Sequence, residues 1–338
     1  MPSQASVVKL DARSGAKLWQ CFTAPENYGV PGNWSGNAVW GSAPTIDEKN
    51  GLVYVGTGNS YDVPDSAKQC MDAATTPQDK GKCLDVPGNW FNSVIGIYIA
   101  NGSLAWGHRV SYVDVWTAAC LPLVPGITDC PVKNSPDYDF GQAPLYFPST
   151  VCGGSETKDI LVAAQKSGWA YGFDARNGEM LWSTPVGPGS TAGGSQWGST
   201  TNGVDTVFLQ NSNHYFLNYT LIKPAPGSPA GRIRHTSQSS AVRMQGQAPA
   251  ADPQRMGAPT YVAAQGSAYV VYPIMSPDGK LVVMRADSGA VWTTLVAGPG
   301  SVVSGPAVAN GYLYVGVGYS RFGWGAPAST HGLAAFKL

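Results

Sequence analysis

The sequence predicts an all-β fold, a β-propeller built from four-stranded antiparallel blades. Three observations lead to this prediction. A strand, a glycine turn and a tryptophan recur along the chain, hairpins of a second type lie between these copies, and no helical 3.6-residue periodicity extends beyond two turns. The composition agrees, because 42 Gly, 26 Pro and 11 Trp in 338 residues are typical of many short strands joined by turns.

The first repeated element is a hairpin that ends in tryptophan. In each copy a Ser-Gly or Asn-Gly pair provides the positive φ that a tight hairpin turn requires. The tryptophan then occupies a fixed place on the outer strand, where it can insert between neighbouring sheets. In the fourth copy the tryptophan comes one residue early. The copies are Leu10–Trp19, Ile97–Trp106, Phe173–Trp182 and Arg285–Trp292.

The second repeated element is a hairpin without the tryptophan. It occurs as Ala43–Asp47 turning into Gly51–Gly56, and again as Gly305–Gly311 turning into Tyr312–Gly316. Two alternating hairpins make a four-stranded unit, and such units in series are propeller blades. A β-sandwich is the alternative architecture, but a sandwich does not need a recurring glycine-to-tryptophan spacing.

This pattern predicts four complete blades and two partial ones within a single domain, 1–338. A half blade opens the chain and most of another closes it. We expect 59–92 to be a disulfide-bearing surface loop inserted into the first complete blade. We expect 222–258 to be irregular, because its composition is typical of a loop or a disordered segment. The complete blades are expected at about 38–110, 140–188, 194–247 and 256–298.

Charge and hydropathy exclude some classes of function. The formal net charge is zero, which argues against a nucleic-acid partner. No run of about 18 apolar residues occurs, so no membrane span is expected. The first residues contain no apolar signal-peptide core and lead almost at once into a strand, which suggests a chain truncated at its N-terminus.

The cysteines indicate an oxidising compartment, either extracellular or similar to a periplasm. One pair, Cys70 and Cys83, brackets a short polar loop, and a second pair, Cys120 and Cys130, brackets another. Such pairs are typical of disulfides in secreted chains, although four free thiols on loops are the alternative. No CxxC or CxxCH motif occurs, so neither a zinc knuckle nor a covalently attached haem is expected.

One block of sequence is specific to a known family. The run Gly36–Pro44, followed by Asp47 and then by Leu52–Asn59, resembles the quinoprotein alcohol dehydrogenases. The branch it most resembles is the polyvinyl-alcohol-dehydrogenase-like proteins, including their plant members, with a likeness that weakens between about 222 and 260. The resemblance implies an eight-bladed propeller with pyrroloquinoline quinone at its centre, and a chain that begins inside that propeller.

The resemblance also implies a site. Trp40 matches the tryptophan that forms the floor under the quinone, where it stacks on the flat ring system; a core tryptophan between blades is the alternative. Asn59 matches an asparagine whose oxygen binds Ca²⁺, a cation that prefers oxygen ligands; a residue that merely ends a strand is the alternative. Asp114 matches the general base beside the metal, but Thr117 stands where the family has a second aspartate.

Two further segments match cofactor-lining positions of the family. Lys166 aligns with a basic residue that contacts the quinone oxygens and would stabilise a developing oxyanion; simple solvent exposure at a hairpin tip is the alternative. In Gly193–Gly198, Gln196 would replace the usual asparagine, and Trp197 follows it.

The function implied is the oxidation of an alcohol group, by hydride transfer to Ca²⁺-bound pyrroloquinoline quinone. The substrate would be a small-molecule or polymeric alcohol, and a separate acceptor would take the electrons. The family's upstream blades carry a Ca²⁺-binding glutamate that cannot be assigned here, so this chain could be inactive as a fragment. A non-catalytic propeller acting as a binding scaffold is the alternative. A lectin propeller would also expose tryptophan and tyrosine, but it would not explain Asn59, Asp114 and Lys166 together.

Overall fold

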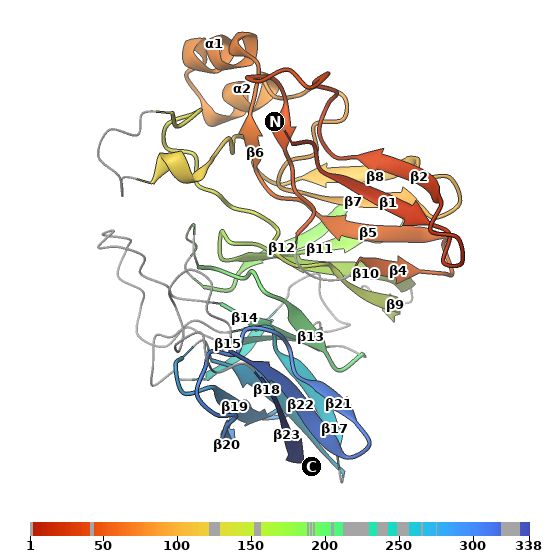
Figure 1. Cartoon of the computed structure of the whole chain (residues 1–338), viewed down its shortest axis with the longest axis vertical. Coiled ribbons are helices and arrows are strands. Elements are labelled where there is room, and N and C mark those ends of the chain that lie inside the picture. The colour runs from red at the N-terminus through yellow and green to blue at the C-terminus, as the bar shows by residue number, and fades with distance from the viewer. Residues whose placement is uncertain are drawn as a thin grey trace.

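The computed structural model is a series of antiparallel sheets that follow one another along the chain (Figure 1). It describes residues 3–40, 44–121, 129–151, 157–187, 189, 191, 193–203, 206–211, 230–234, 243–248, 257–264, 266–274, 276–318 and 332–338. Within these residues there are four sheets of four strands, a two-stranded sheet at the N-terminal end and a three-stranded sheet at the C-terminal end. The predicted β-propeller of four complete and two partial blades is therefore confirmed.

The first partial blade and the first two complete blades hold the N-terminal half of the chain. The partial blade consists of β1 (Ser6–Leu10) and β2 (Lys17–Phe22). The first complete blade consists of β4 (Thr45–Asp47), β5 (Leu52–Gly56), β7 (Ser93–Tyr98) and β8 (Leu104–Arg109). The second consists of β9 (Leu145–Val151), β10 (Thr157–Ala164), β11 (Trp169–Asp174) and β12 (Met180–Pro185). A short pair, β3 (Ser35–Gly36) and β6 (Ser60–Asp62), lies beside them.

The remaining blades hold the C-terminal half. The third blade consists of β13 (Ser199–Thr201), β14 (Thr206–Gln210), β15 (Ala230–Arg234) and β16 (Arg243–Ala248). The fourth consists of β17 (Thr260–Ala264), β18 (Ser267–Pro273), β19 (Lys280–Arg285) and β20 (Val291–Val296). The last, partial blade consists of β21 (Ala307–Ala309), β22 (Tyr312–Val317) and β23 (Gly332–Lys337).

Part of the stretch expected to be irregular is regular backbone. Strands β15 and β16 lie within 222–258 and complete the third blade, with β15 pairing antiparallel to β14. Backbone hydrogen bonds can extend a sheet whatever the polarity of the added side chains, which explains why composition alone misled at these two strands. Residues 222–229, 235–242 and 249–256 lie outside the described residues.

The segment expected as a disulfide-bearing surface loop carries its disulfide on two short helices. These are α1 (Asp65–Ala73) and α2 (Pro77–Lys82), and the Cys70–Cys83 disulfide ties α1 to the end of α2. Thr76 caps α2 by accepting a hydrogen bond from the Asp79 N–H at 3.1 Å, and proline at the first helical position favours the same start. A third helix is a single 3-10 turn, Ala118–Cys120, and the Cys120–Cys130 disulfide is also formed.

In its first two copies, the repeated tryptophan joins one blade to the next. The Trp19 Nε1–H donates to the Ile99 carbonyl at 3.0 Å, and the Trp106 Nε1–H donates to the Ala175 carbonyl at 3.0 Å. A Cβ on Gly102 would lie 2.6 Å from the Trp19 ring, and one on Gly178 would lie 2.3 Å from the Trp106 ring. The glycine turn of one blade is thus both a tight turn and the surface on which the preceding blade's tryptophan docks.

Successive blades pack face to face, and this packing forms the core. Leu52, Tyr54 and Trp106 of the first complete blade are buried against Leu161 and Phe173 of the second. Equivalent clusters lie between the other neighbouring blades. The first strands of the complete blades lie next to one another, in the order β4, β9, β13 and β17. The loops that lead into these strands are therefore brought together on the side of the blades where the first strands lie.

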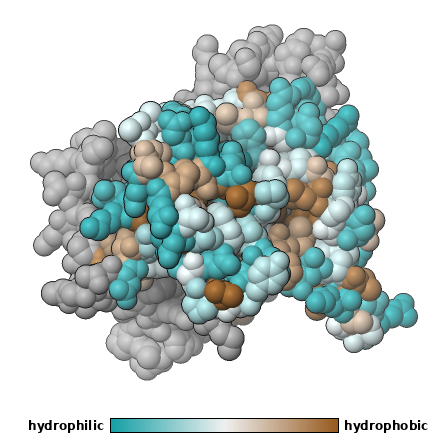
Figure 2. Space-filling model, turned by 90° about the horizontal axis from the view of Figure 1, so that it is seen from above, coloured by the Kyte–Doolittle hydropathy of each residue, from teal (hydrophilic) through white to brown (hydrophobic). Residues whose placement is uncertain are grey.

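The outer surface is mixed in polarity. Figure 2 shows the face at the α1–α2 end of the molecule, where small hydrophobic areas are interspersed with hydrophilic residues. Surfaces of this kind are common in globular proteins. Among the described residues, no helix has the length and apolar character needed to cross a membrane.

Candidate functional site

The sequence-predicted site residues lie in loops at the ends of blade strands. Trp40 precedes β4, Asn59 follows β5, and Asp114 lies in the loop after β8. Lys166 lies in the turn between β10 and β11, and Trp197, with Gln196 beside it, precedes β13. Loops placed by rigid strands are where binding residues commonly occur in such scaffolds.

Asp139 links two of these residues directly. Its Oδ1 accepts the Asn59 backbone N–H at 2.7 Å, and its Oδ2 accepts the Lys166 ammonium at 2.5 Å. Asp137 Oδ2 accepts the same ammonium at 3.1 Å. The Lys166 Nζ also lies 5.0 Å from the centroid of the Trp40 ring, within the range of a cation–π contact. Trp40, Asn59 and Lys166 therefore belong to one connected cluster.

Asp114 is fully buried and its carboxylate accepts three hydrogen bonds. The donors are the Asn92 amide at 2.8 Å, the Tyr138 backbone N–H at 2.6 Å and the Asp137 backbone N–H at 3.0 Å. Burial raises the pKa of Asp114 to about 6, although these hydrogen bonds act in the opposite direction. Asp114 is thus held in place by the same segment that supplies the partners of Lys166.

The backbone and side chain of Asn59 are also fixed. Its Nδ2–H₂ donates to the Ser60 carbonyl at 2.7 Å and to the Trp116 carbonyl at 2.6 Å. Both amide protons are thereby used, which sets the direction of the side-chain oxygen. The neighbouring Ser60 N–H donates to the Asp114 carbonyl at 3.0 Å, so Asn59 and Asp114 lie on adjoining stretches of backbone.

Trp40 lies at the edge of this cluster and is half-buried. Its Nε1 is buried and has no hydrogen-bond partner among the described residues. A Cβ on Gly58 would lie 2.6 Å from that nitrogen and 2.3 Å from Asp139 Oδ1. A glycine is therefore required at 58 for the indole and the carboxylate to approach the backbone this closely.

Charges within the cluster are close together and out of contact with water. Burial alone would lower the pKa of Lys166, but Asp139 and Asp137 outweigh it and hold that pKa above its ordinary value. Burial raises the pKa of Asp137 well above its ordinary value, Lys166 counteracts this, and the nearby carboxylates of Asp139 and Asp114 raise it further. Buried ionisable groups with strongly shifted pKa values are common at functional sites.

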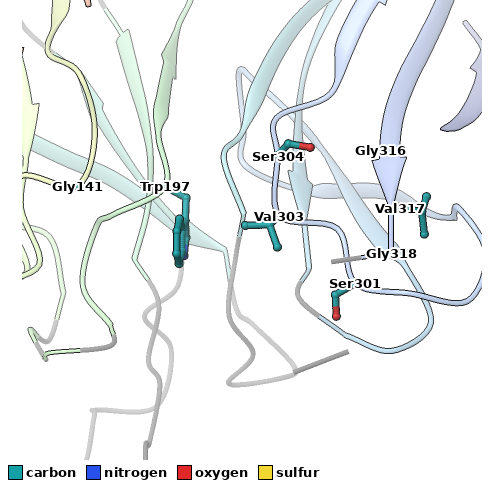
Figure 3. A pocket seen from close by; sticks show the side chains of 8 residues that line it. All are labelled: Gly141, Trp197, Ser301, Val303, Ser304, Gly316, Val317 and Gly318. Carbon is teal, nitrogen blue, oxygen red and sulfur yellow. The ribbon is translucent and has the colours of Figure 1, made fainter. Parts of the chain in front are cut away.

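Gln196 and Trp197 connect this cluster to a cavity. Gln196 is buried and packs on Gly141, two residues after Asp139. Trp197 lines a cavity of about 550 Å³, and Figure 3 shows it on the wall opposite Ser301 and Val303. The described residues that line it are Gly141, Trp197, Ser301, Val303, Ser304, Gly316, Val317 and Gly318, and none of these eight carries a charged side chain.

The structure adds three residues that the sequence reasoning missed: Asn92, Asp137 and Asp139. The aspartate expected directly after Trp116 is replaced by Thr117, and two aspartates reach the cluster from a segment some twenty positions later. The signal in the sequence was the acidic pair in Asp137-Tyr138-Asp139, just after the second cysteine pair. Among the described residues, no three His, Cys, Asp or Glu side chains are close enough together to hold a metal ion on their own.

Comparison with known proteins agrees with this architecture. The chain is 30% identical, over an alignment of 349 residues, to a polyvinylalcohol dehydrogenase from a Pseudomonas species, covering 94% of this chain and 47% of the relative. It is 29% identical over 209 residues to a polyvinylalcohol dehydrogenase from Sphingopyxis, covering 59% of this chain and 28% of the relative. The chain thus spans less than half the length of these curated relatives. No family model matches the sequence.

Solved structures share the fold at low sequence identity. A quinohemoprotein alcohol dehydrogenase from Pseudomonas putida superposes with a TM-score of 0.61 at 14% identity, covering 100% of this chain and 57% of that one. The quinohemoprotein alcohol dehydrogenase from Comamonas testosteroni gives 0.58 at 15% identity, covering 98% and 56%. The chain therefore shares the β-propeller fold of these alcohol dehydrogenases. Its sequence relatives are the polyvinylalcohol dehydrogenases, of which it is a homologue.

Proposed function

We propose that this chain forms the metal- and quinone-facing part of an alcohol dehydrogenase that uses pyrroloquinoline quinone and Ca²⁺. The observation that supports this most directly is the cluster itself. Asn59, Asp114 and Lys166 come from separate loops, yet Asp137 and Asp139 connect all three within hydrogen-bond distance.

The chemistry of the side chains fits both groups. Ca²⁺ prefers oxygen ligands, which the Asn59 side-chain oxygen and the Asp114 carboxylate offer. A flat anionic quinone suits an aromatic face beside a cation, as Trp40 and Lys166 provide. The Trp40 Nε1, for which the described part of the chain offers no acceptor, adds an N–H donor at the same place. The remaining Ca²⁺ ligands would come from the quinone and from groups outside this set.

Each residue would have a distinct role in the reaction. The quinone, when bound with Ca²⁺, supplies the acceptor for the hydride that leaves the alcohol carbon. Asp114 would take the hydroxyl proton, and a pKa near 6 places it in the range of an effective general base. Lys166 would keep a positive charge close to oxygens that become more negative during the reaction. Trp40 would orient the ring by stacking.

The substrate would be an uncharged, hydroxylated chain. Two observations support a polymeric alcohol over a small one: the names of the sequence relatives, and a cavity whose described lining is uncharged and presents Trp197 together with Ser301 and Ser304. A separate acceptor would take the electrons. The two disulfides favour an oxidising compartment, extracellular or periplasmic.

A non-catalytic binding scaffold is the second candidate. The observation in its favour is that both oxygens of Asp114 already accept hydrogen bonds from Asn92, Asp137 and Tyr138. A carboxylate bonded in this way can serve as a brace for two loops without any chemistry.

One experiment separates the two candidates. Purified chain is mixed with pyrroloquinoline quinone and Ca²⁺, free quinone is removed by gel filtration, and the quinone absorbance that remains with the protein is measured. The proposal expects retention by the wild-type chain, loss in Asn59→Ala and Asp114→Ala, and retention in the control Asp65→Ala, whose side chain is 86% exposed on α1. If the folded wild-type chain retains no quinone, the enzyme proposal fails for this chain and the non-catalytic scaffold is favoured.

A further inference from the structure

We propose that Asp139 is a positioning residue that holds Asn59 and Lys166 in one fixed geometry, so that the metal-facing and quinone-facing sides of the site cannot move independently. The proposal rests on the proposed function, because it concerns the placement of that site's residues. Asp139 would touch neither the metal nor the quinone and would act only through its two neighbours.

The contacts of Asp139 support this role. Its side chain is fully buried, and its two oxygens point to different partners: Oδ1 accepts the Asn59 N–H at 2.7 Å and Oδ2 accepts the Lys166 ammonium at 2.5 Å. Its carbonyl also accepts the Lys166 backbone N–H at 3.0 Å. Three bonds therefore connect residues of two different blades through one aspartate.

The surrounding backbone leaves Asp139 and Lys166 little freedom. A Cβ on Gly58 would lie 2.3 Å from Asp139 Oδ1, and a Cβ on Gly194 would lie 2.0 Å from the Lys166 carbonyl oxygen. Both glycines therefore bring main chain against the pair at a distance that no side chain permits. A close-packed site of this kind transmits a displacement of one group to the next.

Asp137 provides an internal comparison. It accepts the same Lys166 ammonium at 3.1 Å, but none of the described hydrogen bonds connects it to Asn59. Its backbone N–H braces Asp114 instead, at 3.0 Å. Removing the Asp137 carboxylate should therefore loosen Lys166 alone, whereas removing the Asp139 carboxylate should loosen Lys166 and Asn59 together.

The first test needs neither quinone nor metal. Wild-type chain and the variants Asp139→Asn, Asp139→Ala and Asp137→Asn are labelled briefly with an amine-reactive reagent, and mass spectrometry quantifies each lysine. In wild type, Lys166 should be far less reactive than Lys82, whose side chain is 74% exposed. Each variant should raise Lys166 labelling by about tenfold or more, because each one weakens a hydrogen bond between charged groups, which are among the stronger hydrogen bonds. Labelling of Lys82 should not change.

The second test separates positioning from general support. Ca²⁺ affinity, measured by calorimetry in the presence of the quinone, should fall about tenfold or more in Asp139→Ala, the usual effect of removing a partner of a metal ligand. In Asp139→Asn the side-chain oxygen can still accept the Asn59 N–H, so Ca²⁺ affinity should be largely restored while Lys166 stays reactive. Asp137→Asn should leave Ca²⁺ affinity less affected than Asp139→Ala.

The outcomes distinguish this proposal from the proposed function. Increased Lys166 labelling in the variants of a chain that retains no quinone would support the positioning role and contradict the enzyme. Unchanged Lys166 labelling in folded Asp139→Ala would overturn the positioning role even if quinone binds. If Asp139→Ala does not fold, wild type still decides, because a Lys166 as reactive as Lys82 would overturn the proposal.

Discussion

The N-terminal and C-terminal halves of this propeller use the same blade but differ in what they bury. All charged side chains that are buried within the described residues lie in the first half, before position 175, while the second half buries only uncharged polar groups. The charged set is Asp47, Asp114, Asp137, Asp139, Asp159, Lys166 and Asp174. Buried charge is costly unless it is paired, and four of these seven side chains, Asp114, Asp137, Asp139 and Lys166, belong to the candidate site.

The tryptophan hairpin shows a second difference between the halves. Trp106 is 8% exposed and docks on the next blade, but Trp292 is 59% exposed and contacts Tyr269 of its own blade. The two tryptophans occupy different places relative to a bulge in the strand pairing. Trp106 follows the bulge and pairs with Gly96, whereas Trp292 lies in the bulge and Thr293 pairs with Val283.

The difference shows why spacing matters more than the mere presence of tryptophan. A one-residue shift in a strand sends the side chain to the other face of the sheet. Opposite Trp106 stands a glycine, whose added Cβ would lie 2.8 Å from the indole, so the ring lies flat over the neighbouring strand. The same cross-strand pair recurs as Gly172 and Trp182, and it is absent from the fourth blade.

The largest expected effect comes from removing the docked tryptophan. Trp106→Ala should lower the free energy of unfolding by about 3–5 kcal/mol, because it removes a buried ring and its hydrogen bond to Ala175. Trp292→Ala should cost less than about 1 kcal/mol, as is usual for surface positions. Urea unfolding of both variants checks this, and equal losses would contradict the distinction between the two halves.

The next effect depends on pH and on the buried charge of the first half. The pKa of Asp114 rises from 3.8 to about 6 on folding, so the folded state binds the proton more tightly. Stability contributed by this proton is present below pH 4 and is lost as pH rises to about 6, a total of about 3 kcal/mol. Asp114→Asn should remove that part of the slope.

The measurement for Asp114 is the free energy of unfolding without added metal, at several values between pH 4 and pH 7.5. The slope is compared rather than the absolute stability, because asparagine changes the hydrogen bonds to Asn92 and Tyr138 equally at every pH. Identical slopes for wild type and Asp114→Asn would show that Asp114 does not titrate in this window.

A smaller effect isolates the docking surface of the tryptophan. Gly178 and Gly289 have nearly the same φ, +73° and +72°, so alanine at either position strains the backbone by about 1–2 kcal/mol. At Gly178 the new Cβ would also lie 2.3 Å from the Trp106 ring, while nothing lies within 4 Å of it at Gly289. Gly178→Ala should therefore destabilise by about 1–3 kcal/mol more than Gly289→Ala, as measured by thermal unfolding.

Much of the fold followed from the sequence because hairpins are local. The glycine turns at 15, 102 and 178 have the positive φ that the pattern required, and the blade limits agree with the strands to within seven residues. Helices α1 and α2 were not predicted because they are short, and one is capped by Thr76 and tied by a disulfide rather than built on an apolar stripe. Composition misled at β15 and β16 because backbone pairing there does not depend on it.

Candidate site residues could be chosen from the sequence only where motif and position coincide. Trp40, Asn59 and Lys166 lie in one cluster, and the sequence could place them together only through the family resemblance. Asp137 and Asp139 were missed because they lie more than twenty positions after Asp114 in the sequence. The intervening chain, which carries the Cys120–Cys130 disulfide, returns them to Asp114 in space. Periodicity cannot reveal a contact that a long loop makes.

The smallest effect tests whether the glycine opposite the tryptophan determines its docking. In a chain that carries Trp292→Thr, the bulge position no longer holds a tryptophan. Adding Thr293→Trp then restores the usual four-residue spacing from Gly289. With Val283 opposite, the new indole has no flat surface to cover, so this change should not stabilise. When Val283 is also replaced by glycine, the new tryptophan should stabilise the chain. Thr293→Trp and Val283→Gly should therefore couple by about 0.5–1 kcal/mol in a double-mutant cycle. A coupling of zero would mean that the next blade, and not the cross-strand glycine, holds the tryptophan in the first half.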